Sequence, residues 1–563
     1  MGTATFNLID DPWIIVHDLD GETHTAGIRS LFDGSINAAA IVGDSPTQDY
    51  SVLRVLLAIF WRAHHAALAP SLQSRQARDE FKWSRWFADK KKRLAAEARD
   101  DEVLDYLDNH HDRFNLFDPE APFMQVAGLD TTKQTRLSIS RIVPEAEHDY
   151  FTMRTGEGRK ALSFAEAARW LVHTQAYDYS GIKSGAIGDS RVKGGRGYPI
   201  GTGWTGMTGG TVVMRETLLE TLLFNSTPAA IYAGNSDADL ASWERTPDTA
   251  SERADVFPKG PADLATWQSR RVRLFEEEGL VTAVLVSNGD QIPEAGKNIL
   301  GDPMTPYRFS ANKSKKGEPP VYYARPYDLN RTMWRSLDPL IATESDSGFD
   351  GKNRAPKRPD TLENLGTLTW QGVLEREILD LRIVSMEYGP QASSVGTIVS
   401  ANVHLPVVFF EDDDLAKEAR LTARTAADAT MNAAISMGWF AGQLAVAAGG
   451  EYVFGSDAAD RFLAALEPRF NQWLATVNWD NLEDAGETWQ REVVSQARSL
   501  ADELVAGAGP KALAGRVVPP RNEGDNPTVI SAGGLRDALA RRLRKDLPLA
   551  HPPQTPEQKE SAQ

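Results

Sequence analysis

The chain has 563 residues, which is too long for one ordinary domain and indicates two to four folded units. With 61 Lys and Arg against 78 Asp and Glu, the formal net charge is −17, which excludes a highly basic protein that coats nucleic acid by itself. The 41% hydrophobic content excludes global disorder, and the lack of cysteine excludes disulfide scaffolds, thiol catalysis and Cys-ligated metal sites. Because residues 1–12 also lack the pattern of a secretory signal, we expect a cytoplasmic protein.

The beginning of the chain predicts strands followed by two long helices. Residues 13–28 surround Asp20-Gly21, a two-residue turn signal that predicts a β-hairpin. Apolar residues at helical spacing predict a helix over 49–69, and a second helix is predicted over 76–97.

The next part of the chain predicts one helix between two irregular segments. Residues 128–160 are polar and lack periodicity, which predicts a long loop of a kind that is uncommon in compact domains unless it has a function. Ser163-x-x-Glu166 is a capping box, and it predicts a helix that ends near Tyr177. Residues 178–210 are dense in glycine, which lets a backbone approach a ligand closely.

Helical and strand patterns alternate up to residue 410. We predict a helix over 262–278, a strand over 280–287 and a turn at Asn288-Gly289. Further short strands are predicted near 321–327, 378–388 and 396–409. Residues 1–405 are therefore expected to form a mixed α/β domain.

The pattern after Phe410 is helical. The acidic run Glu411–Asp414 suits a helix N-terminus, and long patterns with short connections predict a four-helix bundle over 406–550. Its helices are expected at about 413–449, 457–477, 486–508 and 531–547. Residues 426–450 are apolar but contain polar side chains, which favours a packed bundle helix over a membrane span. Residues 551–563 predict a disordered tail, and the fold class is α+β.

No enzyme motif stands out. Gly201-x-Gly203-x-x-Gly206 matches a dinucleotide fingerprint by letter, but no strand leads into it and no helix follows, so no cofactor is predicted. The histidines lack metal-ligand spacing, so no metal site is predicted either. One alternative stays open, a stand-alone α/β hydrolase that uses two carboxylates about 5–10 Å apart.

Several basic groups lie in loops that contain Gly or Pro and few acids, a pattern suited to contact with phosphates. A further group shares one face of the predicted last helix and would suit the backbone of a single strand. The alternative for each group is an ordinary solvated surface. These candidate strand-backbone contacts are Lys313, Lys315, Lys316, Lys352, Arg354, Arg541, Arg544 and Lys545.

The opening Phe6-Asn7-Leu8-Ile9-Asp10-Asp11-Pro12-Trp13-Ile14 resembles the N-terminus of the CasA family, the large subunit of the type I-E CRISPR complex Cascade. The resemblance covers nearly the whole chain, in order and spacing, and ends in the predicted bundle. It rests on four further motifs: Pro122-Phe123-Met124-Gln125, Tyr150-Phe151, Gly181-Ile182-Lys183-Ser184-Gly185 and Gly389-Pro390-Gln391-Ala392-Ser393.

This resemblance implies a nucleoprotein subunit and not an enzyme. It implies that the protein reads the protospacer-adjacent motif (PAM) of double-stranded DNA, helps to separate the strands for R-loop formation, and recruits the helicase–nuclease for antiviral defence. The implied partners are the CRISPR guide RNA, target double-stranded DNA, the backbone and small subunits of Cascade, and the helicase–nuclease, with no membrane. It implies an RNA-guided division of labour, in which the protein reads the PAM and base pairing reads the target.

The resemblance also implies roles for individual residues. Ser180, Gly181 and Lys183 match the family's glycine loop, where backbone amides lie against the minor groove and Lys183 is expected to hold a phosphate. Pro390, Gln391 and Ala392 match a hairpin whose glutamine is a wedge between bases. Phe151 matches an aromatic that touches the 5′ handle of the guide RNA.

Two departures from the family pattern affect the predicted DNA contacts. Pro390 stands where relatives can have Asn, so a side-chain hydrogen bond to a base is lost at this position. The lysine that some members place in the minor groove maps near residues 289–292, where there is none, and Lys297 is a candidate substitute. The zinc-like insert of some members is absent, since the chain has no cysteine.

Overall fold

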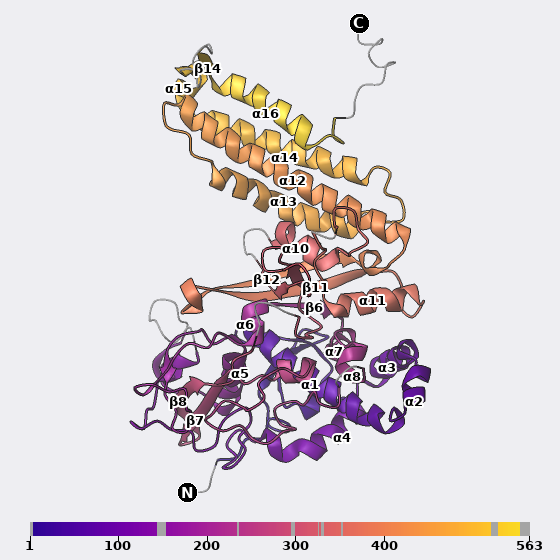
Figure 1. Cartoon of the computed structure of the whole chain (residues 1–563), viewed down its shortest axis with the longest axis vertical. Helices are drawn as coiled ribbons and strands as arrows, with labels where there is room; N and C mark the ends of the chain where they lie inside the picture. The colour runs from indigo at the N-terminus through magenta and orange to yellow at the C-terminus, as the bar shows by residue number, and fades with distance from the viewer. Residues whose placement is uncertain are drawn as a thin grey trace. The chain divides into compact units, whose positions relative to one another are not determined.

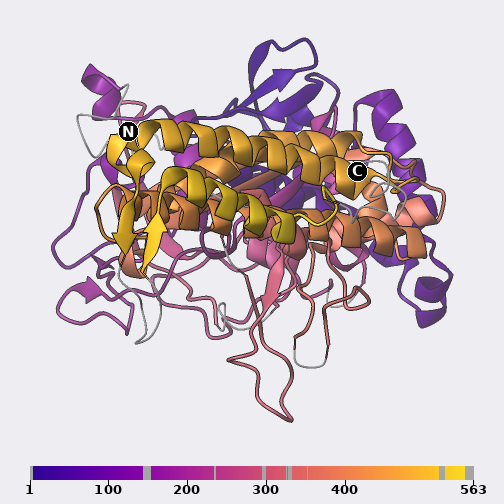
Figure 2. The same ribbon diagram turned by 90° about the horizontal axis from the view of Figure 1, so that it is seen from above.

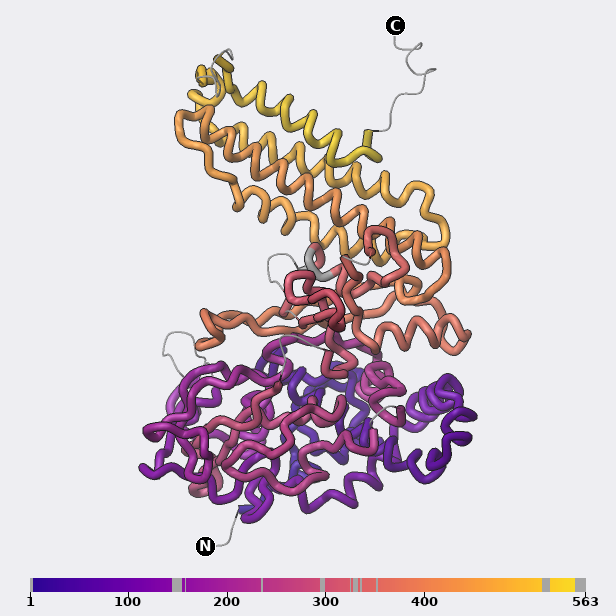
Figure 3. Tube along the Cα trace, viewed as in Figure 1, coloured from indigo at the N-terminus to yellow at the C-terminus, as the bar shows by residue number. Residues whose placement is uncertain are grey.

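The structure is a computed structural model of the chain, traced in Figure 3. It describes residues 4–143, 154–233, 236–293, 299–324, 326–327, 332–350, 353–518 and 527–551. The chain divides into two compact units. The first comprises residues 1–327, 350–375 and 380–402, and the second comprises residues 328–349, 376–379 and 403–563. The second unit therefore includes short segments that precede the predicted bundle in the sequence.

A buried helix, α1 (Pro46–Leu68), forms the core of the first unit. Ser45 caps it by accepting a hydrogen bond from the backbone N–H of Gln48, and it packs against several shorter helices (Figure 1). The segment over residues 46–71 is long and apolar enough to cross a membrane, but 78% of its most apolar stretch is buried inside the protein. We therefore interpret α1 as a core helix. Its helical neighbours are α4 (Asp101–His110), α5 (Phe164–Tyr177), α7 (Leu218–Phe224), α8 (Pro228–Ile231) and α9 (Pro261–Ala265).

Small antiparallel sheets surround this core. The predicted hairpin at Asp20-Gly21 is confirmed, with Gly21 at φ 82°. The three-stranded sheets have the orders β2-β1-β3 and β12-β11-β6. Their strands are β1 (Ile14–Asp18), β2 (Thr23–Ala26), β3 (Ala38–Ile41), β6 (Gly210–Met214), β11 (Ile378–Tyr388) and β12 (Val395–Pro406). The two-stranded hairpins are β4 (Lys183–Ser184) with β5 (Arg196–Gly197), β7 (Arg270–Glu277) with β8 (Leu280–Asn288), and β9 (Tyr307–Phe309) with β10 (Tyr322–Ala324).

The predicted helix over 262–278 is wrong beyond its first turn. Only α9 is helical, and residues 270–277 form strand β7, which pairs with β8 along its whole length. Glu278 and Gly279 both have positive φ and close the hairpin as a two-residue turn. The apolar run in this segment fits either a helix or a strand, and the turn together with the pairing of β8 selects the strand.

The predicted helix over 76–97 is broken into two helices. Helix α2 (Arg75–Glu80) ends before Phe81, whose backbone is extended, and α3 (Trp83–Glu97) begins after Lys82. The Phe81 ring packs edge-on against Tyr232, with 4.7 Å between the ring centroids. This packing turns the side chain away from the direction that a continuous helix would give it. The predicted start of α5 is confirmed, because Ser163 Oγ accepts a hydrogen bond from the backbone N–H of Glu166, while the Glu166 carboxylate pairs with Arg154. The first unit also contains α6 (Trp204–Thr208) and α11 (Asp360–Trp370).

The second unit contains the predicted four-helix bundle. Helix α12 (Asp414–Ala447), capped by Asp413, packs against the three other long helices of the bundle, which Figure 2 shows from above. Aromatic rings such as Phe470 and Trp489, whose centroids are 4.9 Å apart, pack between helices of the bundle. The buried guanidinium of Arg420 pairs with Asp346 at 2.8 Å, which attaches residues 332–350 to α12. The helices are α12 (Asp414–Ala447), α13 (Ser456–Thr476), α14 (Ala485–Gly507) and α16 (Ala532–Asp546), with α10 (Thr332–Ile341), α15 (Gly509–Ala514), β13 (Arg516–Val518) and β14 (Thr528–Ile530) beside them. Residues 552–563 of the predicted tail lie outside the described residues.

Candidate nucleic-acid interface

The two segments that were predicted to contact the PAM meet in the first unit. We call residues 178–203 the glycine loop and residues 387–396, between β11 and β12, the glutamine hairpin. The backbone N–H of Ser180 donates to the carbonyl oxygen of Ala392 at 2.6 Å. Ser180 Oγ in turn accepts a hydrogen bond from the backbone N–H of Gly201 at 3.0 Å. Ser180 therefore joins both arms of the glycine loop to the glutamine hairpin, although more than 200 residues separate Ser180 from Ala392 in the sequence.

The tip of the glutamine hairpin has an unusual backbone. Gln391 and Ala392 have φ values of 58° and 52°, in the left-handed region that residues with a Cβ rarely adopt. Hydrogen bonds from Gly389 N to Ser394 O and from Ser393 N to Pro390 O hold this conformation. Gln391 is exposed. Strained non-glycine residues concentrate at functional sites, which makes the tip of this hairpin a candidate site.

Tyr388 anchors the base of the glutamine hairpin. Its hydroxyl donates to the carbonyl oxygen of Tyr177 at 2.8 Å, at the C-terminal end of α5. A Cβ on Gly206 would lie 2.5 Å from this hydroxyl oxygen, so only glycine leaves room for the contact. The hairpin is thus held against the rest of the first unit at its base and at its tip, so the backbone that carries Gln391 has little freedom to move.

Asp178, at the start of the glycine loop, is surrounded by cations. Its carboxylate accepts two hydrogen bonds from Arg141, at 2.7 and 3.0 Å, and one from Arg270 at 2.5 Å, and it lies 3.1 Å from the Lys183 Nζ. Burial by itself would raise the pKa of Asp178, but Arg270, Arg141 and Lys183 together hold it well below its usual range. Arg270 also donates to the carbonyl oxygens of Tyr179 and Gly201. This cluster fixes the glycine loop and leaves the region with more positive than negative charge.

Lys183 does not present its ammonium for the predicted phosphate contact. Its side chain is only 1% exposed, and Nζ donates to the carbonyl oxygen of Tyr179 at 2.7 Å and lies 3.9 Å from the centre of the Tyr179 ring. Burial lowers the pKa of Lys183 to about 7, although Asp178 opposes the shift. In this conformation Lys183 supports the loop from inside, because strand β4 turns its side chain inward.

The glycine loop also contains exposed cations besides the buried Lys183. The exposed cations of the glycine loop are Lys193 and Arg196, which pair with each other across a tight turn at the start of β5. They flank Gly194 and Gly195, whose φ values of 59° and 73° make the turn. Lys193 and Arg196 differ from Lys183 in exposure, because their side chains face solvent and that of Lys183 faces the interior. The sequence alone does not reveal this difference.

Two of the other predicted basic loops come together in the first unit. Lys313, Lys315 and Lys316 are exposed on the turn between β9 and β10. Residue Lys357 exchanges two backbone hydrogen bonds of 2.8 Å with Tyr307 of β9, which places the segment of exposed Arg354 beside the same hairpin. In the second unit, α16 exposes the predicted residues Arg541, Arg544 and Lys545. Phe151, Lys297 and Lys352 lie outside the described residues.

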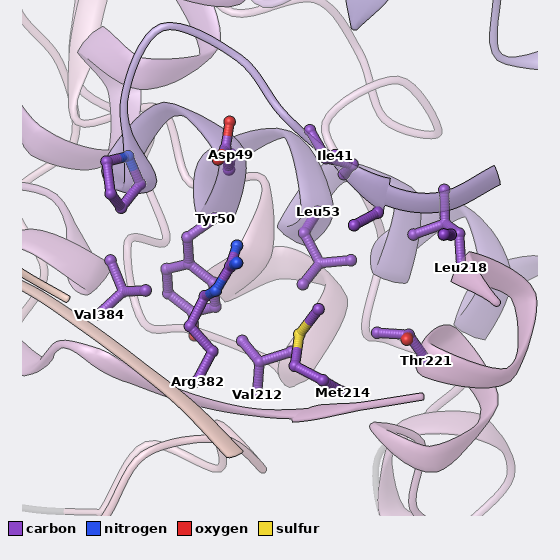
Figure 4. A pocket seen from close by; sticks show the side chains of 13 residues that line it. Ile41, Asp49, Tyr50, Leu53, Val212, Met214, Leu218, Thr221, Arg382 and Val384 are labelled. Atoms are coloured by element: carbon purple, nitrogen blue, oxygen red, sulfur yellow. The ribbon is translucent and has the colours of Figure 1, made fainter. Parts of the chain in front are cut away.

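A pocket behind the β6–β11 pair bears on the hydrolase alternative. Figure 4 shows it between these strands, α1 and the end of β3, with Asp49 and Arg382 among apolar side chains. Asp49 accepts a hydrogen bond from the backbone N–H of Gly43 at 2.6 Å, and burial raises the pKa of Asp49 to about 6. Among the lining residues, Asp49 is the single carboxylate, so this pocket lacks the pair of acids that the hydrolase alternative needs.

One group of possible metal ligands occurs in the described residues, and a lysine already fills it. Ligand atoms of His64, Asp100 and Glu102 lie within 4.8 Å of one another. The buried Nζ of Lys90 donates to Asp100 at 3.2 Å and to Glu102 at 2.9 Å. The ammonium supplies the positive charge that a metal ion would bring, so we interpret the group as a structural ion cluster.

Comparisons with known proteins place the chain in a family. A family model described as CRISPR-associated protein Cse1 matches residues 7–500. The CRISPR-associated protein CasA/Cse1 of Thermus thermophilus is 30% identical over 389 residues, which cover 67% of this chain and 66% of that protein, slightly less than two thirds of its length.

Solved structures agree over nearly the whole chain. The crystal structure of Thermobifida fusca Cse1 matches with a TM-score of 0.80 at 34% identity, over 97% of this chain and 99% of that one. Cse1 from Acidimicrobium ferrooxidans matches with a TM-score of 0.74 at 24% identity, over 98% and 100% of the two chains. A chain of a CRISPR RNA-guided surveillance complex shares the fold, with a TM-score of 0.61 at 19% identity, over 90% and 99%. From its sequence and from its fold, this chain belongs to the CRISPR-associated Cse1 family.

Proposed function

We propose that this protein is the large, non-catalytic subunit of a cytoplasmic type I-E CRISPR surveillance complex, in which it recognises the PAM of duplex DNA and promotes strand separation. The observation that carries the proposal is the hydrogen bond between Ser180 and Ala392, which unites the glycine loop and the glutamine hairpin. The glycine loop, whose backbone a DNA groove could approach closely, therefore lies beside the hairpin that carries the exposed side-chain amide of Gln391.

The glycine loop is proposed to read the minor groove. Gly181 is half-buried, and a Cβ at this position would lie 2.7 Å from the Tyr179 ring, so a side chain here would disturb the loop. The minor groove displays a degenerate pattern of donors and acceptors, which implies that several related motifs are accepted. In place of Lys183, the exposed Lys193 and Arg196 are proposed to contact the phosphates.

The glutamine hairpin is proposed to separate the first base pair next to the motif. Unstacking a base step costs a few kcal/mol, so a side chain that inserts between bases must be carried by a rigidly held backbone. The backbone of the hairpin is held by the hydrogen bonds of Ser180 and Tyr388 and by the closed turn over residues 389–394.

The proposal also includes partners. Resemblance to a chain of an RNA-guided surveillance complex supports assembly with guide RNA, backbone subunits and small subunits, and the family pattern assigns Phe151 to the 5′ handle of the guide. The edge with Lys313, Lys315, Lys316 and Arg354, and the α16 face with Arg541, Arg544 and Lys545, are proposed contacts with DNA strands. Recruitment of the helicase–nuclease after R-loop formation completes the proposed function.

Mobility shifts with the assembled complex test the proposal. Duplexes that share the target and differ only in the flanking motif are compared, with the chain alone as the control. We expect motif-dependent binding by the complex and weak, motif-independent binding by the isolated chain, because its net charge is −17. Equal affinity of the complex for all flanking motifs would refute PAM recognition.

A further inference from the structure

An open cleft in the first unit lies outside the proposed DNA-binding site. It has a volume of about 590 Å³ and is bounded by the junction of α2 and α3, the start of α8 and the outer face of α11. Figure 1 shows α2, α3 and α11 on one side of this unit. None of the lining residues belongs to the glycine loop or the glutamine hairpin. A volume of this size lies within the range of about 300–1,000 Å³ that is typical of ligand pockets.

The floor of the cleft is aromatic. Phe81, Trp83 and Tyr232 line it, and all three are only partly buried. The ring centroids of Trp83 and Tyr232 are 6.0 Å apart, and those of Phe81 and Tyr232 are 4.7 Å apart. Trp83 Nε1 donates a hydrogen bond to Asn364 Oδ1 at 2.8 Å, which links the aromatic floor to helix α11. The break between α2 and α3 creates this arrangement, since a continuous helix would turn Phe81 and Trp83 differently.

The wall formed by α11 is acidic. Asp360 and Glu363 line the cleft at the first turn of the helix and are exposed, and Lys82 is the one lining residue with a positive charge. Glu363 is 64% exposed, and its carboxylate forms an ion pair with Arg358 Nε at 3.8 Å while keeping this exposed surface open to the cleft. The cleft therefore offers two carboxylates and the faces of aromatic rings, the combination that attracts a guanidinium or ammonium group.

We infer that this cleft is a docking site for a segment of a partner protein that inserts an arginine or lysine side chain between the aromatic floor and the acidic wall. The charge selects the partner: phosphates would be repelled by Asp360 and Glu363, whereas a cationic side chain gains from both rings and carboxylates. Trp370, one turn after the lining residue Thr367, is 70% exposed and extends the apolar contact area along α11. Exposed tryptophan and arginine are the residue types that dominate binding energy at protein interfaces.

A probe of defined chemistry tests this inference without DNA or assembly. N-acetyl-arginine amide and its neutral counterpart N-acetyl-citrulline amide are titrated into the full chain, and binding is followed by nuclear magnetic resonance of labelled tryptophan side chains. We expect the arginine probe to shift the Trp83 signal and to bind about tenfold more tightly than the citrulline probe. The variant with Asp360→Asn and Glu363→Gln should lose this preference, and Glu278→Gln, on the exposed β7–β8 turn, should keep it. Equal binding of the two probes, or an unchanged preference in the double variant, would overturn the inference.

The class of partner is tested in the assembled complex. A photoreactive amino acid replaces the exposed Thr367 in the cleft, and the cross-linked products are identified by mass spectrometry. We expect a cross-link to a protein segment that contains Arg or Lys and that disappears in the double variant. A cross-link to RNA or DNA, or to a protein segment without a basic residue, would contradict the assignment. Because this test does not depend on the flanking motif, its failure is distinguishable from failure of PAM recognition.

Discussion

Two substitutions of Gln391, by glycine and by alanine, distinguish the strain of the hairpin-tip backbone from the role of the side-chain amide. The left-handed backbone at φ 58° costs a residue with a Cβ about 1–2 kcal/mol, and glycine avoids this cost. Glycine also loses about 0.5–1 kcal/mol more conformational entropy on folding. We therefore expect Gln391→Gly to raise the free energy of unfolding by about 0.5–1 kcal/mol, and Gln391→Ala, which keeps the Cβ, to leave it nearly unchanged.

Both variants lose the amide, so both should open DNA more slowly. The amide offers hydrogen bonds to the edge of an unpaired base of about 0.5–1.5 kcal/mol each. A loss of about 1.4 kcal/mol from the opening barrier slows the step about tenfold. Gln391→Asn keeps a shorter amide and tolerates the left-handed backbone, so it should retain part of the rate.

Stopped-flow fluorescence of a base analogue next to the motif measures opening by the complex, and mobility shifts measure initial motif binding. Urea denaturation of the isolated chain measures stability. The expected pattern is a slower opening step, motif binding within about twofold of the original protein, and stability that is unchanged or higher. An unchanged opening rate in Gln391→Ala would refute the wedge. A large loss of stability in Gln391→Gly would refute the account of the strained turn.

Three further predictions concern the glycine loop and buried ion clusters. Asp178→Asn should destabilise the first unit by about 3 kcal/mol in urea denaturation, because the buried Lys183 and Arg270 and the partly buried Arg141 lose the carboxylate that they share; an unchanged midpoint would contradict the role of the cluster. Lys193→Ala with Arg196→Ala should weaken binding of the complex to all duplexes alike and reduce the salt dependence by about two phosphate contacts; selective loss for one motif would instead indicate base reading. Burial raises the pKa of Asp248 and of Asp263 to about 6, so the folded state binds more protons than the unfolded state between about pH 4 and 6. The contribution of Asp248 and Asp263 to the free energy of unfolding should therefore increase as pH falls from 7.5 towards 5. The Asp248→Asn variant should show a smaller change of stability over this range. Identical pH profiles of the variant and the original protein would contradict a raised pKa of Asp248 in the folded state.

Helices with a strong local signal were predictable from the sequence. The four bundle helices begin and end within one or two residues of the predicted positions, because their apolar spacing extends over many turns and Asp413 caps the first of them. Ser163 and Glu166 likewise located the start of α5. These features depend on residues that are neighbours in the chain.

Segments with short apolar runs were not predictable in the same way. Residues 270–277 became a strand because β8 pairs with them, and the helix predicted over 76–97 breaks at Phe81, whose ring packs against Tyr232. In both cases the deciding contact comes from another part of the chain, and local propensity is too weak to oppose it.

The amino-acid sequence by itself determined the α+β class, the helical C-terminal part, the family resemblance and the residues of the glycine loop and glutamine hairpin. Its net charge of −17 predicts that strong binding to nucleic acid is not spread over the whole surface. Only the tertiary structure decided that Ser180 meets Ala392, that Lys183 is buried against Asp178, and that Lys193 and Arg196 are exposed. The physical reason is that burial and pairing depend on which segments pack together, and a lysine has the same letter whether its ammonium faces water or a buried carboxylate.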